Sequence, residues 1–105
     1  MNVETSEVVR GLRRGVELAP DDANAHLLLG TALAEAGQLA EALGHLQRAV
    51  ALDPALVRGH IRSGNLLREL SRTGEAVEAY GRALELRPAD PFILSNLGNA
   101  WLDLS

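Results

Sequence analysis

The sequence contains no cysteine and no lysine, and it has only one tryptophan, one tyrosine and one phenylalanine. Without cysteine, the chain has neither a disulfide framework nor a thiolate metal site. No apolar run approaches the roughly 20 residues that a helix needs to span a bilayer. Aromatic and β-branched residues are scarce, and this disfavours β-strands. These absences predict a helical protein with an aliphatic core and no membrane partner.

The first residues, MNVETSEVVRG, lack the basic-then-apolar layout of a signal peptide. We therefore expect a cytoplasmic protein. All ten basic residues are arginine, a bias that we interpret as the codon usage of a GC-rich bacterium. The net charge is −4. Because phosphate backbones attract strongly basic proteins, this charge argues against a nucleic-acid partner.

Leucine and alanine together supply 36 of the 105 residues, which favours helix. The same residue types also return at a fixed interval of 34 positions. Agreement of several residue types at one period indicates an internal repeat. The repeated positions are Leu18, Leu52 and Leu86; Pro20, Pro54 and Pro88; Gly30, Gly64 and Gly98; Ala42 and Ala76; Ala49 and Ala83; and the large apolar set Leu12, Leu46 and Tyr80.

The repeated positions fit pairs of helices. His26, Leu29, Gly30 and Leu33 follow the spacing of one helix face. We expect the small residues where two helix axes approach closely, with Leu46 or Tyr80 filling the space beside them.

Turn and capping signals delimit these helices. Gly37 and Gly74 are predicted to mark the turn inside each pair. Because Gly74 comes three residues later in its unit, we expect a longer first helix there. Asp90 before Pro91 is typical of an N-cap, and Asp21 or Asp22 is expected to serve the same purpose.

These features resemble the tetratricopeptide repeat family, whose unit is a 34-residue helix–turn–helix. The stretch LLLGTALAEAGQLAEALGHLQRAVALDP follows the family pattern closely. The second unit, RSGNLLRELSRTGEAVEAYGRALELRP, departs from it at Ser63, where a large apolar residue is usual. The resemblance implies an all-α, right-handed superhelical solenoid of antiparallel helix pairs, with about six helices.

The phase of the repeat divides the chain unevenly. We predict a single domain over 1–105, made of a half repeat 1–22, full repeats 23–56 and 57–90, and a half repeat 91–105. The predicted helical segments are about 3–18, 22–52, 56–86 and 91–104, of which the two long ones are helix pairs. The first segment is a second helix without its first, and the last is a first helix without its second. We therefore expect a fragment of a longer protein.

The last helix does not have the polar face of a capping unit. Its apolar residues spread over most of its circumference, and such patches usually mark an interface. Trp101 and Leu104 are the predicted self-association residues, and a homodimer through this helix is one outcome. A following segment of a longer protein is the other, and the two are compatible.

No catalytic or metal constellation stands out. His26 and His60 share a repeat position without further ligands around them, so each is expected to pack between helices. His45 falls on the outer helix, where we expect it to be solvated. Glu35 and Glu69, like other repeated glutamates, are interpreted as surface or capping charges. We predict that the chain is not an enzyme and needs no cofactor or metal.

The resemblance implies a concave groove lined by the first helix of each unit. Asparagine side chains there can donate to and accept from a peptide backbone. Arg58 and Arg62 lie one helical turn apart and are suited to bind one carboxylate. The predicted ligand-binding residues are Leu28, Thr31, Arg58, Ile61, Arg62, Asn65, Asn96 and Asn99.

The predicted function is a protein–protein interaction module, a scaffold or adaptor. It would bind an extended peptide or a partner helix, with an acidic or C-terminal carboxylate as the favoured ligand group. Some chaperone-binding members of the family use a clamp of basic residues and asparagine, but Leu27 and Thr31 stand at its first-helix positions. Two alternatives remain: non-catalytic targeting repeats of a larger bacterial enzyme, such as a glycosyltransferase or sulfotransferase, and a self-association module that uses its open ends.

Overall fold

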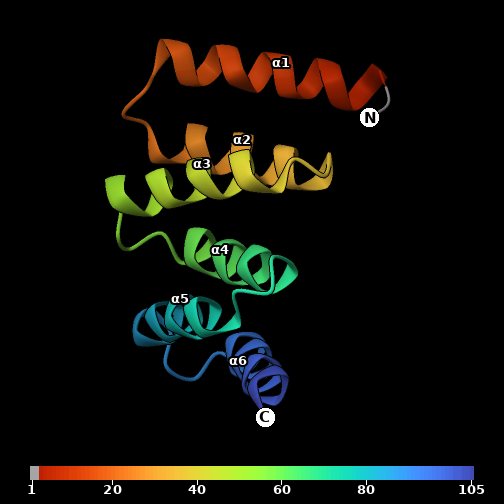
Figure 1. Ribbon diagram of the computed structural model, residues 1–105. Coiled ribbons are helices and arrows are strands. Elements are labelled where there is room, and N and C mark those ends of the chain that lie inside the picture. The colour runs from red at the N-terminus through yellow and green to blue at the C-terminus, as the bar shows by residue number, and fades with distance from the viewer. Residues whose placement is uncertain (1–2) are drawn as a thin grey trace. The chain divides into compact units, whose positions relative to one another are not determined.

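The structure is a computed structural model that describes residues 3–105, with side chains from residue 6 onward. In that range it consists of six α-helices without a strand, which confirms the all-α prediction (Figure 1). The first two residues of the predicted half repeat 1–22 lie outside the described residues. The helices are α1 (Val3–Leu18), α2 (Ala23–Glu35), α3 (Leu39–Leu52), α4 (Val57–Glu69), α5 (Thr73–Leu86) and α6 (Pro91–Leu104).

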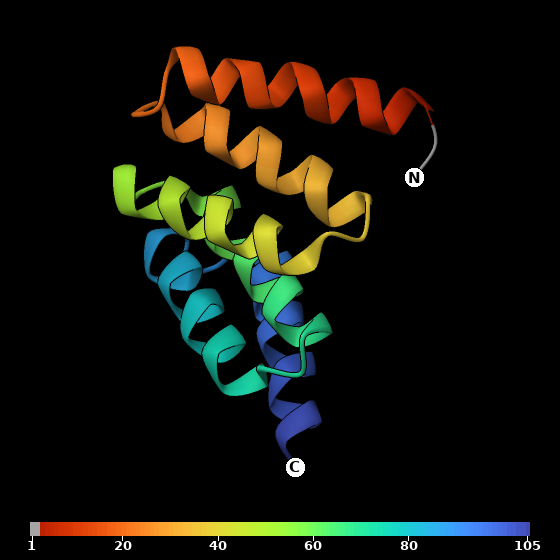
Figure 2. The same ribbon diagram turned by 45° about the horizontal axis from the view of Figure 1, so that its top comes forward.

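Contacts divide these helices into two compact units, one ending at Pro54 and the other beginning at Ala55. In the first unit, α2 packs against both α1 and α3. In the second unit, α5 packs against both α4 and α6. Figure 2 shows α2 with α3, and α4 with α5, as antiparallel neighbours joined by short turns. Each unit therefore contains one complete helix pair and one additional helix.

Two repeated glycines allow the helices of each pair to approach closely. A Cβ atom on Gly30 would lie 2.9 Å from Cγ of Leu46, and one on Gly64 would lie 2.6 Å from the ring of Tyr80. Real Cβ atoms do not come this close to a neighbour, so these positions require glycine. The prediction that Leu46 and Tyr80 fill the space beside small residues is confirmed, and both side chains are fully buried.

Aspartate side chains begin two of the helices. Oδ1 of Asp22 accepts hydrogen bonds from the backbone N–H groups of Asn24 and Ala25, at 2.9 and 3.3 Å. Oδ1 of Asp90 does the same for Phe92 and Ile93, also at 2.9 and 3.3 Å. These bonds satisfy backbone donors that have no partner inside the helix. The predicted N-caps at Asp22 and Asp90 are confirmed.

The turn of the second pair differs from the prediction. Gly37 has φ 83°, as expected for a turn glycine, but Gly74 lies inside the first turn of α5. The left-handed residue of that turn is Ser71, with φ 61°, one 34-residue period after Gly37. Helix α4 has 13 residues, the same length as α2, so the expected longer first helix is also wrong. The repeat period, not the nearest glycine, sets the turn.

Among the described residues, no helix is both long enough and apolar enough to cross a membrane.

Candidate functional site

Helix α4 carries four of the predicted ligand-binding residues on one stripe. Arg58, Ile61, Arg62 and Asn65 are spaced three, one and three residues apart, so they share one side of the helix. Together with Phe92 of α6, they line a hollow of about 200 Å³ within the second unit. The opposite side of α4 is buried and carries Gly59, His60, Ser63, Gly64, Leu66 and Leu67.

The two arginines of this hollow have no ion-pair partner among the described side chains. Both are exposed. By contrast, Arg68 on the same helix pairs with Asp103, and Arg72 pairs with Glu75. The positive charges of Arg58 and Arg62 are therefore free to meet an external anion. A planar guanidinium can hold a carboxylate with two parallel hydrogen bonds.

Asn65 is held at the hollow by a buried tyrosine. The hydroxyl of Tyr80 donates a hydrogen bond to Oδ1 of Asn65. Burial raises the pKa of Tyr80, with Arg68 acting in the opposite direction, so the phenol remains a donor at neutral pH. This bond uses one of the two lone pairs of the Asn65 carbonyl oxygen, so the side chain keeps one acceptor site and its Nδ2 donors.

The apolar part of the hollow comes from two elements. Phe92, in the first turn of α6, is 62% exposed. Ile61 of α4 is half-buried. An exposed aromatic ring beside two unpaired cations gives the hollow both an apolar contact and a charged one. The site combines features suited to a peptide with a carboxylate and an apolar side chain.

The other predicted groove residues do not line this hollow. Leu28 and Thr31 belong to α2 in the first unit, where Leu28 is 54% exposed. The hydroxyl of Thr31 donates to the backbone carbonyl of Leu27 at 2.8 Å. On α6, Asn99 is exposed, while Nδ2 of Asn96 is enclosed and has no hydrogen-bond partner.

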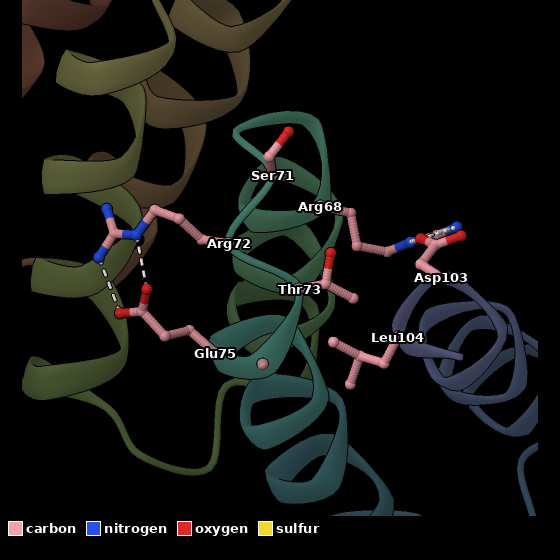
Figure 3. Close-up of a pocket in the computed structure, with 8 residues that line it drawn as sticks. Arg68, Ser71, Arg72, Thr73, Glu75, Asp103 and Leu104 are labelled. Carbon is pink, nitrogen blue, oxygen red and sulfur yellow. Dashed lines mark hydrogen bonds and ion pairs between the residues drawn. The ribbon is translucent and has the colours of Figure 1, made fainter.

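A second hollow lies at the turn between α4 and α5 (Figure 3). Nε of Arg68 donates to Oδ2 of Asp103 at 2.9 Å, which ties α4 to α6. Arg72 donates to both carboxylate oxygens of Glu75, at 2.6 and 2.7 Å. These hydrogen bonds raise the pKa values of both arginines and lower that of Glu75. Because each charge is compensated inside the chain, this hollow is a weaker candidate for an ionic ligand.

The predicted self-association residues are both on the surface of α6. Trp101 is 57% exposed and Leu104 is 49% exposed. Leu104 also borders the second hollow, as does Thr73 (Figure 3).

Two of the three histidines, His26 and His45, form a hydrogen-bonded pair in the first unit. Nε2 of His26 lies 2.7 Å from the carbonyl oxygen of Pro20, which can only accept, so this nitrogen carries the proton. Nδ1 of His26 then accepts from Nδ1 of His45 at 3.1 Å, and the two rings stack. The expectation of a solvated His45 is wrong. Residues 3–105, as far as they are described, hold no cluster of three metal-ligating side chains.

Sequence comparison identifies two stretches that match known family models. A model described as "Tetratricopeptide repeat" matches residues 9–56, and one described as "TPR repeat" matches residues 64–104. No curated protein sequence matches the chain.

Solved structures with the same fold include the MamA protein, with a TM-score of 0.89 at 23% identity over 94% of this chain. The chain spans 54% of the MamA chain in that structure. The first TPR of Spaghetti (RPAP3), bound to the HSP90 peptide SRMEEVD, has a TM-score of 0.91 at 23% identity. That match covers 96% of this chain and 80% of the other.

A third similar structure is the O-GlcNAc transferase of Thermobaculum terrenum. It is 34% identical over 93% of this chain, with a TM-score of 0.83, and this chain spans 19% of it.

Proposed function

This chain belongs to the tetratricopeptide repeat family, and we propose that it is a non-catalytic protein-interaction module that binds an extended peptide through a carboxylate. The observation that carries the proposal is the pair of arginines on α4. Arg58 and Arg62 lack carboxylate partners among the described side chains and face one hollow together with Phe92. The first TPR of Spaghetti, solved with a peptide that ends in aspartate, supports this class of ligand.

In the proposed complex, the guanidinium groups of Arg58 and Arg62 bind the carboxylate with charge-assisted hydrogen bonds. Nδ2 of Asn65 donates to a peptide carbonyl. Ile61 and Phe92 contact an apolar side chain of the peptide. Because Leu27 and Thr31 occupy the first-helix positions of the chaperone-type clamp, we place the charge recognition on α4 instead.

The test is fluorescence anisotropy with a labelled peptide of sequence SRMEEVD at low ionic strength, where charge attraction is least screened. Arg62→Glu places a negative charge beside the carboxylate, and we expect at least about tenfold weaker binding, or about 1.4 kcal/mol. Arg82→Glu is the matched control, since Arg82 is also exposed and unpaired among the described side chains but does not line the hollow. It should bind like the wild type.

The chemistry of the ligand is tested with the same peptide carrying a C-terminal amide. It should bind the wild type more weakly than the free acid, and Arg62→Glu should narrow that difference. Equal affinity of wild type and Arg62→Glu for the free acid would contradict the proposed contact.

A second candidate function rests on the Thermobaculum terrenum structure, the match with 34% identity. In this alternative, the chain is the non-catalytic targeting segment of a larger glycosyltransferase. Sequencing the gene beyond the codon for Ser105 tests it. An in-frame catalytic domain would favour the alternative, and an immediate stop codon would contradict it.

A further inference from the structure

Helix α6 exposes the face that the equivalent helices bury. Leu33 of α2 and Leu67 of α4 are 0% and 5% exposed, and each lies on the first helix of a complete pair. Trp101 holds the same repeat position in α6 and is 57% exposed. The position of His26, which is 6% exposed, holds Leu94 in α6, which is 47% exposed. The exposed stripe of α6 therefore corresponds to residues that are buried in the first helices of the two complete pairs.

The glycine of this stripe leaves a space that matches a large side chain. Leu46 and Tyr80 fill the spaces at Gly30 and Gly64, and each follows its glycine by 16 residues. A Cβ atom on Gly98 would meet nothing within 4 Å. Helix α6 thus lacks the large residue that both complete pairs supply.

Helix α1 carries the complementary surface. Leu12 stands one period before Leu46 but is only half-buried, whereas Leu46 is 1% exposed. Val8 is 54% exposed, whereas Ala42, one period later, is fully buried. Helix α1 therefore has the residues of a second helix without a first helix against them.

The repeat also fixes how the two surfaces would meet. Leu12 belongs to the same repeat position as Leu46 and Tyr80, the residues that fill the spaces at Gly30 and Gly64. In the repeat, this is the position that lies opposite a glycine equivalent to Gly98. We propose that α1 of a second copy packs against α6, with Leu12 opposite Gly98, so that two copies complete a helix pair of the repeat. On this surface Val8 is larger than Ala42, while Gly15 is smaller than Ala49. The total side-chain volume therefore changes little, which packed interfaces tolerate best.

This contact joins different surfaces of the two copies, so it is heterologous. Every dimer keeps one unoccupied α1 and one unoccupied α6, and further copies can add until a ring closes. The contact does not use Arg58 or Arg62, so it is independent of the proposed peptide site.

Two substitutions test the contact from its two sides, measured by light scattering on a size-exclusion column over a wide concentration range. Gly98→Leu fills the space on α6 without displacing any neighbour in the single copy. Val8→Glu places a charge on the exposed face of α1. The matched control is Gly44→Leu, because Gly44 is exposed on a helix and also has nothing within 4 Å of a Cβ atom.

We expect wild type and Gly44→Leu to form dimers and larger species with rising concentration, and each of the other variants to remain monomeric alone. Mixed in equal amounts, Val8→Glu and Gly98→Leu should form a one-to-one dimer. In this dimer, the unchanged α6 of Val8→Glu packs against the unchanged α1 of Gly98→Leu. That dimer should not grow, because both of its remaining surfaces are blocked.

Three results would overturn the proposal. A wild type that stays monomeric at every concentration would mean that another segment or partner covers α6. Unchanged association of Val8→Glu would indicate a symmetric contact through α6 alone. A mixture that stays monomeric would show that the two surfaces do not meet. Circular dichroism of each variant confirms that the helices are intact, and peptide binding by Val8→Glu should equal that of the wild type.

Discussion

At the scale of single residues, a few side chains determine how the second unit is built. Gly64 lets the ring of Tyr80 lie directly against α4. From that position the Tyr80 hydroxyl reaches Asn65 and fixes it beside the hollow. One close approach inside the helix pair therefore also orients a predicted ligand contact.

Among the described residues, Ser71 is the non-glycine residue with a positive φ. Its φ of 61° lies in the left-handed region, which costs a residue with a Cβ about 1 kcal/mol relative to glycine. Glycine relieves this strain, although its greater freedom in the unfolded chain offsets part of the gain, so we expect Ser71→Gly to raise the free energy of unfolding by about 0.5–1 kcal/mol. Chemical denaturation monitored by circular dichroism measures this.

The matched controls for that prediction are two glycine substitutions. Gly37→Ser introduces the same strain in the first pair and should lower stability by a similar amount. Gly74→Ala lies in a helix, has nothing within 4 Å of its new Cβ atom and should not destabilise. The assignment of the turn to Ser71 would be contradicted if Gly74→Ala lowered the free energy of unfolding and Ser71→Gly did not raise it.

At the scale of helices, the histidine pair connects α2 to α3. Burial and, next, the neighbouring His26 lower the pKa of His45, while Glu41 acts in the opposite direction and Arg13 adds to the lowering. The folded state thus favours neutral His45. This contribution to stability is complete above the ordinary pKa of 6.5 and is lost as pH falls from there through the lowered pKa.

We therefore expect the free energy of unfolding to fall between pH 7.5 and pH 5.5 in the wild type. One titrating group limits the slope from His45 to about 1.4 kcal/mol per pH unit. His45→Gln should show a smaller fall, because it removes that group. Arg13 and Glu41 remain charged over this range, since their hydrogen bond lowers the pKa of Glu41. If the free energy of unfolding fell equally with pH in the wild type and in His45→Gln, His45 would not be the group responsible.

The sequence predicted the helices better than the contacts between them. The 34-residue period and the caps at Asp22 and Asp90 place the ends of the four predicted helical segments within one residue of the observed helix ends, but the turn inside the second pair was misplaced. The stripe from Arg58 to Asn65 was predictable because it lies opposite a buried stripe on one helix. The left-handed Ser71, the stacked His45 and the Arg68–Asp103 ion pair were missed. Each depends on packing between elements, although the period from Gly37 already pointed to Ser71.

At the scale of the whole molecule, the distribution of charge matters more than its sum. The net charge is −4, and six of the ten arginines pair with carboxylates in the described chain. Arg58 and Arg62 do not, and both face the hollow on α4. An acidic chain therefore presents a local cationic surface, which favours one orientation of an anionic peptide.

The most direct test of the proposed binding site is an NMR titration of the ¹⁵N-labelled protein with the SRMEEVD peptide. We expect the largest shifts at the side-chain Nδ2 hydrogens of Asn65, the Nε–H groups of Arg58 and Arg62, and the backbone around Phe92. Shifts centred elsewhere, such as on the exposed stripe of α6, or no shifts at millimolar peptide, would contradict the account.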